Sequence, residues 1–152
     1  THSIRFDIAD NLAFVVIAPP YEVRTADARK VMPESVSTDV AVWQIGHAVA
    51  AVNALESGDA ALLARACQDK LHEPHRSALI ADYEPLRRTA LAAGAATFLI
   101  SGSGSTMLAI ADGKAAAQRV ADAVENMVEN HVDGVWVRVL DANACGATVE
   151  VA

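Results

Sequence analysis

Residues 97–112 read Thr-Phe-Leu-Ile-Ser-Gly-Ser-Gly-Ser-Thr-Met-Leu-Ala-Ile-Ala-Asp, a loop of Gly, Ser and Thr between two apolar runs. The runs at 97–100 and 107–111 predict two strands, because each is short, apolar and bounded by turn residues. The loop at 101–106 has two interpretations. It is either a structural hairpin turn or one wall of a phosphate site, in which accessible backbone N–H groups approach a charged ligand.

Two common phosphate-binding motifs are excluded for this loop. A Walker A loop needs Gly-Lys-Ser/Thr at the start of a helix, whereas this loop has no Lys and precedes a strand-like run. The dinucleotide motif G-x-G-x-x-G also fails, because Met107 stands where its third glycine belongs. Any phosphate site here therefore needs charge from elsewhere in the fold.

The composition predicts one packed globular domain over residues 1–152. Of these residues 53% are hydrophobic and 20% charged, which is typical of a folded chain with a sizeable core. The net charge of −7 argues against nucleic acid as a partner, since a general binder presents a basic face to phosphates. An anion site in this chain must be built locally.

Cysteine use and hydropathy indicate a cytoplasmic protein. Cys67 and Cys145 are too far apart in sequence to suggest a disulfide framework or a metal pair. No apolar stretch approaches the roughly 18–20 residues of a membrane span, so no membrane partner is expected. The chain begins at Thr1 within a strand-like alternation at Ile4, Phe6 and Ile8, and we expect this start to lie inside a longer protein.

The remaining apolar patterns predict alternating strands and helices. A strand covers Leu12 to Ala18, and Thr25 is expected to cap a short helix that ends before Pro33. Further helices are expected at 39–57, after Asp59, at 82–94 and from Lys114 to near Asp133, and closing strands at 135–140 and 148–151. The helix at 39–57 carries one apolar stripe, formed by Val42, Ile45, Val49, Val52 and Leu55.

The order of these elements predicts an α+β fold. Strand, helical insertion, helix, strand, strand, helix and strand make the split βαβ pattern, which is the ferredoxin-like arrangement. We therefore expect an antiparallel sheet with helices on one face and a helical insertion. The Gly-rich loop then joins the two middle strands of the sequence.

The chain shows no convincing metal site but two candidate anion ligands. His72-Glu73-Pro74-His75 lacks one residue of the zinc motif H-E-x-x-H, and Pro74 would interrupt the helical turn that this motif needs. Arg29 and Arg76 flank the helical insertion, and a guanidinium grips carboxylate or phosphate through two parallel hydrogen bonds. The alternative is that both arginines are solvated surface charges.

Three segments together resemble the C-terminal half of homoserine kinases, members of the GHMP small-molecule kinase superfamily. Residues 71–76, Leu-His-Glu-Pro-His-Arg, resemble the family's Leu-His-Glu/Gln-Pro-Tyr-Arg, and residues 101–106 resemble Ser-Gly-Ser-Gly-Pro-Thr. Residues 23–33 are similar to Val-Ser-Thr-x-x-Ala-Arg-x-x-Leu-Pro. The departures are His75 for Tyr, Ser105 for Pro, and Gly46-His47 for Ser-Arg, which bear on substrate choice.

The resemblance implies a kinase that transfers the γ-phosphate of ATP, with Mg²⁺, to the hydroxyl of L-homoserine in threonine biosynthesis. It implies that Arg29 and Arg76 hold the homoserine carboxylate. It also implies a phosphate loop made of Ser101, Gly102, Ser103, Gly104 and Thr106. No catalytic residue is expected in this chain.

The family's ATP-binding motif, Pro-x-x-x-Gly-Leu-Gly-Ser-Ser-Ala, matches no stretch of these 152 residues. We therefore expect an N-terminal kinase domain as the missing partner, and a chain that is inactive and binds no cofactor by itself. A homodimer is left open. Two alternatives also remain: another GHMP kinase, or a non-catalytic ferredoxin-like module for ligand binding or dimerisation.

Overall fold

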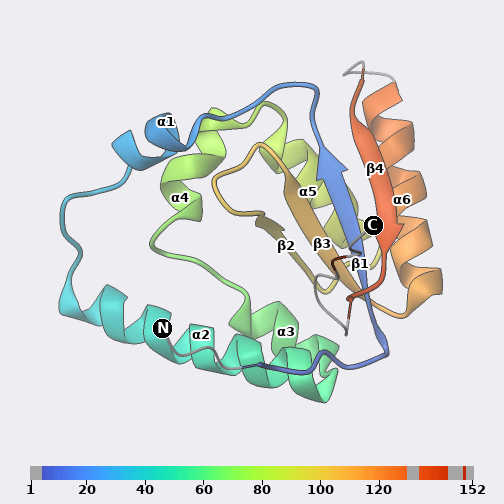
Figure 1. Cartoon of the computed structure of the whole chain (residues 1–152), viewed down its shortest axis with the longest axis horizontal. Helices are drawn as coiled ribbons and strands as arrows, with labels where there is room; N and C mark the ends of the chain where they lie inside the picture. The colour runs from blue at the N-terminus through green and yellow to red at the C-terminus, as the bar shows by residue number, and fades with distance from the viewer. Residues whose placement is uncertain (1–4, 130–133, 144–148, 150–152) are drawn as a thin grey trace.

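The computed structural model describes residues 5–129, 134–143 and 149, which contain a four-stranded antiparallel sheet (Figure 1). The strands are β1 (Leu12–Ala18), β2 (Thr97–Ile100), β3 (Met107–Asp112) and β4 (Trp136–Leu140). The helices are α1 (Thr25–Lys30), α2 (Thr38–Ser57), α3 (Ala60–Ala66), α4 (Glu73–Arg76), the 3-10 turn η1 (Ser77–Leu79), α5 (Tyr83–Ala92) and α6 (Lys114–Glu129). The spatial strand order is β2-β3-β1-β4, and the predicted α+β fold is confirmed.

The main core lies between the sheet and helices α5 and α6. Alternate residues of β1 point to this side, and Ala13, Val15 and Ile17 are at most 1% exposed. Val120 and Val124 of α6 are fully buried against them, as the helical spacing in the sequence predicts. Figure 1 shows α6 lying along the sheet on the side of β4.

The helical insertion packs on part of the opposite face. Leu12 and Ile110, whose side chains point away from the main core, form a smaller cluster with Ala54 of α2 and Leu63 of α3. Asp59 caps α3 as predicted, because its side chain accepts a hydrogen bond from the Leu62 N–H. A cavity remains between the insertion, α4 and the end of β2.

Helix α2 is confirmed, but its apolar stripe is largely uncovered. The helix ends at Gly58, whose φ of 70° gives the left-handed cap that glycine adopts most readily. Val42, Ile45 and Val49 are 64–68% exposed, and Ala54 is the buried residue of this helix. The 3.6-residue periodicity therefore predicted the helix and not the burial of its face.

Other sequence predictions differ from the structure at the ends of elements. Residues 5–9 form no strand, although the Ala9 N–H donates to the Leu55 carbonyl and ties this segment to α2. Thr25 is already the first residue of α1 and not its cap, and the preceding Arg24 makes no side-chain capping bond. The strand predicted at 148–151 lies outside the described residues, apart from residue 149, which is not in a strand. Among the described helices, none is long and apolar enough to cross a membrane.

Candidate functional site

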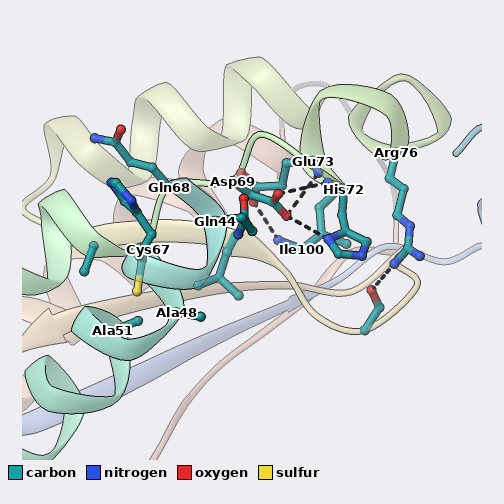
Figure 2. A pocket seen from close by; sticks show the side chains of 14 residues that line it. Gln44, Ala48, Ala51, Cys67, Gln68, Asp69, His72, Glu73, Arg76 and Ile100 are labelled. Carbon is teal, nitrogen blue, oxygen red and sulfur yellow. Dashed lines mark hydrogen bonds and ion pairs between the residues drawn. The ribbon is translucent and has the colours of Figure 1, made fainter. Parts of the chain in front are cut away.

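A cavity of about 400 Å³ opens between α2, α3, α4 and the end of β2 (Figure 2). Helices α2 and α3 contribute mostly small side chains, and the segment leading into α4 contributes polar ones. The lining residues are Gln44, His47, Ala48, Ala51, Ala66, Cys67, Gln68, Asp69, His72, Glu73, Arg76, Leu99, Ile100 and Gly102. The cavity is therefore lined by small apolar side chains from α2 and α3 and by charged side chains from the segment that contains α4.

The short helix α4 is held in place by Asp69. One oxygen of its carboxylate accepts hydrogen bonds from the backbone N–H groups of Leu71 at 2.6 Å and His72 at 2.9 Å. The other oxygen accepts from the Glu73 N–H at 3.3 Å. Pro74 occupies the first turn, where its missing N–H is tolerated. Asp69 followed by Pro74 was the sequence signal for this helix, which our sequence analysis missed.

Glu73 links α4 to the strand that enters the Gly-rich loop. Its carboxylate accepts a hydrogen bond of 3.1 Å from the Ile100 N–H at the end of β2. Burial raises the pKa of Glu73, and the Tyr83 hydroxyl and the Ile100 N–H offset only part of that rise. Burial, together with the negative charge of Glu73, also raises the pKa of Tyr83. Neither apolar periodicity nor motif spacing marks Glu73 as a buried residue, because its burial depends on contacts with β2 and α5.

Arg76 reaches the Gly-rich loop from α4. Its Nη1 donates to the Gly102 carbonyl at 3.0 Å, so the structure brings these two predicted site residues together. The Nε–H is buried without a hydrogen-bond partner. No carboxylate among the described residues forms an ion pair with this guanidinium. Since a guanidinium has five N–H donors, Arg76 retains donors for an anion.

The loop at 101–106 is a hairpin connection with a fixed shape. The Ser101 N–H donates to the Thr106 carbonyl at 2.9 Å, and the Gly104 N–H donates to the Ser101 carbonyl at 3.1 Å. At Gly104 the φ is +83°, and a Cβ there would lie 2.9 Å from Cδ1 of Ile80, so only glycine fits without strain. The backbone of the loop thus requires glycine whatever its chemical role.

The segment that leads into α1 packs against this loop. The Ser105 hydroxyl donates to the Tyr21 carbonyl, and the hydroxyls of Thr25 and Ser103 lie 3.5 Å apart. Arg29 follows on α1, where it is exposed, and it is not among the residues that line the cavity. The structure therefore brings Arg76, but not Arg29, into the cavity with the loop.

The histidines of this region make local contacts. The His72 ring lies 3.4 Å from the Asp69 carboxylate, and His47 stacks on Trp43 with ring centroids 3.5 Å apart. Over residues 5–129, 134–143 and 149, no group of three or more His, Cys, Asp or Glu side chains is placed to hold a metal ion.

Comparison with known proteins gives the family. Residues 51–130, more than half of the chain, match the family described as GHMP kinases C terminal. This chain belongs to that family. It is also 40% identical over 139 residues to a homoserine kinase of Microchaete diplosiphon, a match that covers 91% of this chain and 45% of the relative. The chain therefore spans about half the length of the curated relatives it matches.

Solved structures agree with this assignment. The homoserine kinase of Cytophaga hutchinsonii superposes with a TM-score of 0.81 and 32% identity, covering 90% of this chain and 43% of that one. The Streptococcus pneumoniae phosphomevalonate kinase gives a TM-score of 0.59 with 14% identity over 85% and 40% of the two chains. The likeness to the phosphomevalonate kinase shows a shared fold alone. The chain is thus homologous to the C-terminal region of homoserine kinases.

Proposed function

We propose that this chain is the C-terminal, substrate-side domain of an ATP-dependent homoserine kinase of the cytoplasm, and that residues 1–152 form one domain. The complete enzyme would transfer the γ-phosphate of ATP to the hydroxyl of L-homoserine in threonine biosynthesis. The hydrogen bond from Arg76 to Gly102 carries the proposal, because it unites the proposed carboxylate anchor with the loop. The homoserine kinases among its relatives support the choice of substrate.

In this proposal Arg76 and Arg29 hold the homoserine carboxylate. Arg76 is half-buried and lacks a carboxylate partner among the described residues, so a substrate carboxylate would complete its hydrogen bonds. Arg29 would approach from α1, whose first residue Thr25 lies beside Ser103 of the loop. The two arginines would orient the substrate, since phosphoryl transfer depends mainly on positioning and on neutralising charge.

The loop at 101–106 would form one wall of the phosphate site. A Cβ placed on Gly102 meets no atom within 4 Å, so the space beside this residue is open to a ligand. We assign ATP and Mg²⁺ to an N-terminal kinase domain, in which the phosphates would be cradled and their charge neutralised. No residue of this chain would act on the reacting atoms.

Replacement of Arg76 tests the proposal in the longer protein that contains this chain. Arg76→Lys should raise the KM for homoserine about 10- to 100-fold and leave the KM for ATP unchanged, because Lys cannot make the two-pronged contact. Arg88→Lys, at an exposed position of α5, is the matched control. Initial rates with homoserine and mevalonate would be measured in parallel. An unchanged KM for homoserine, or a preference for mevalonate, would refute the substrate assignment.

A further inference from the structure

Helix α2 carries an apolar stripe that the described residues leave largely exposed. Val42, Ile45 and Val49 are 64–68% exposed, and residues 40–55 contain no Asp, Glu, Lys or Arg. A helix face that meets water normally carries charged or polar side chains. Helix α6 follows this rule, because its exposed positions include Lys114, Gln118, Arg119, Asp122 and Asn126. The outward face of α2 therefore suits contact with another surface better than contact with water.

A groove of about 340 Å³ between α2 and α3 lies next to the stripe. A Cβ placed on Gly46 would meet no atom within 4 Å, so the groove is open along this side of α2. An exposed apolar surface of this kind marks an interaction site, and a groove in it can receive side chains of a partner. The lining of the groove includes Val42, Gly46, Ala50, Leu62 and, as its charged member, Arg65.

A second copy of this chain is a poor partner for the stripe. Asp39 stands in the first turn of α2 and Glu56 in the last turn, at the two ends of the stripe. Antiparallel contact of two α2 helices would bring Asp39 of one copy near Glu56 of the other, and parallel contact would pair each carboxylate with its own counterpart. Each copy also has a net charge of −7, so both arrangements add repulsion between like charges.

The rest of the longer protein is a better partner. The matches to homoserine kinases cover 43–45% of those relatives, so more than half of such a protein lies outside the matched region. Residues 5–9 run beside the C-terminal part of α2 (Figure 1), where the Ala9 N–H donates to the Leu55 carbonyl at 2.9 Å. Phe6 in this segment is 51% exposed and adds to the apolar surface. A domain joined through this segment would be held near the stripe at a high effective concentration.

We propose that the N-terminal domain of the longer protein docks on the apolar stripe of α2, with its own apolar side chains on Val42, Ile45 and Val49 and in the groove. The docking rests on the proposed function, because that function supplies the N-terminal domain. Ala48 and Ala51 of the same helix line the cavity, so a domain seated on the stripe would stand beside the cavity that contains Arg76. This interface would then fix the distance between the two walls of the active site.

Cysteine labelling of the longer protein tests the docking. Ile45→Cys and Val49→Cys each place a thiol on the stripe, and Gln118→Cys, on the exposed face of α6, is the matched control. Labelling with N-ethylmaleimide is read by peptide mass mapping, so that each thiol is followed separately. In native buffer the stripe thiols should react at least about tenfold more slowly than Gln118→Cys, because they react only when the interface opens. In urea all three should react at similar rates.

Photo-crosslinking from a benzoylphenylalanine in place of Val49 identifies the occupant. The expected crosslink joins position 49 to a peptide outside residues 1–152 of the same molecule. A crosslink to residues 1–152, in the same or a second copy, would overturn the proposal, as would stripe thiols that react as fast as Gln118→Cys. Neither measurement needs a substrate. Fast labelling in an active homoserine kinase would thus refute the docking alone, whereas protected thiols in a protein that does not use homoserine would refute the substrate alone.

Discussion

Glu73 is the residue on which the geometry of the candidate site most depends. It starts the helix that carries Arg76, and its carboxylate accepts from the Ile100 N–H immediately before the Gly-rich loop. The side chain is half-buried, so its negative charge loses hydration in the fold. Glu73 thus positions the site, and its partly desolvated carboxylate lowers the stability of the folded state.

The raised pKa of Glu73 predicts a pH-dependent effect of Glu73→Gln. Because the folded pKa lies above its ordinary value of 4.5, the folded state binds the proton more tightly than the unfolded state. The resulting stabilisation is fully present below pH 4.5 and is lost as pH rises through the folded pKa. Glutamine stays neutral and keeps an acceptor for the Ile100 N–H. The free energy of unfolding of Glu73→Gln, relative to wild type, should therefore increase with pH.

Urea unfolding of both proteins at a series of pH values measures this difference. Glu22→Gln, at an exposed position, controls for the loss of one negative charge from the surface. If the free energies of unfolding of wild type and Glu73→Gln changed with pH in parallel, burial would not penalise the charged carboxylate. The result also separates the two roles of Glu73, since the glutamine variant retains the backbone contact.

At the scale of elements, α2 combines a confirmed helix with an uncovered apolar face. Val49 is 68% exposed, whereas Leu63 of the neighbouring α3 is fully buried. Val49→Gln should therefore change the free energy of unfolding of this chain by less than about 0.5 kcal/mol. Leu63→Ala should lower it by about 2–5 kcal/mol, because it leaves a cavity in the cluster under the insertion.

Urea unfolding at two protein concentrations measures both variants. A loss of more than about 1.5 kcal/mol for Val49→Gln, or a loss that depends on concentration, would mean that the stripe is buried in solution. Leu63→Ala serves as the positive control for packing, since both substitutions lie in the same helical insertion.

The elements show how far a sequence predicts this structure. Strand β1 coincides with the continuous apolar run at 12–18, and the loop at 101–106 is flanked by the two predicted strands. Such a local pattern also predicted α2. It did not predict which face of α2 is covered, because that depends on how the insertion docks on Leu12 and Ile110. Helix α4 was missed since its stability comes from the Asp69 side chain and not from apolar periodicity.

The candidate site was predictable only in part, because its lining depends on how separate segments pack together. Arg76 and the loop could be proposed from motif spacing, and the structure places their atoms within hydrogen-bond distance. The alanines of α2 and Cys67 belong to no motif, and the segment 71–76 does not by itself mark the Glu73 carboxylate as part of a cavity wall. Their grouping arises from packing between α2 and residues that lie 16 to 25 positions further along the chain.

At the scale of the whole molecule, the chain supplies one side of the proposed active site. It covers 45% of its homoserine kinase relative, and no stretch of it matches the family's ATP-binding motif. Loss of a single group that stabilises developing charge already lowers kcat about 10²- to 10³-fold. The 152-residue chain should therefore phosphorylate homoserine more than about 10³-fold slower than the longer protein does.

ADP release in the presence of ATP, Mg²⁺ and homoserine measures this difference, with the longer protein assayed in the same buffer. Circular dichroism establishes that the chain is folded, so that a low rate reflects missing groups and not a missing sheet. If the folded chain reached a rate within tenfold of the longer protein, the phosphate site would have to be complete within these residues. The loop at 101–106 would then bind the phosphates itself, because its open face at Gly102 lies beside the Arg76 guanidinium.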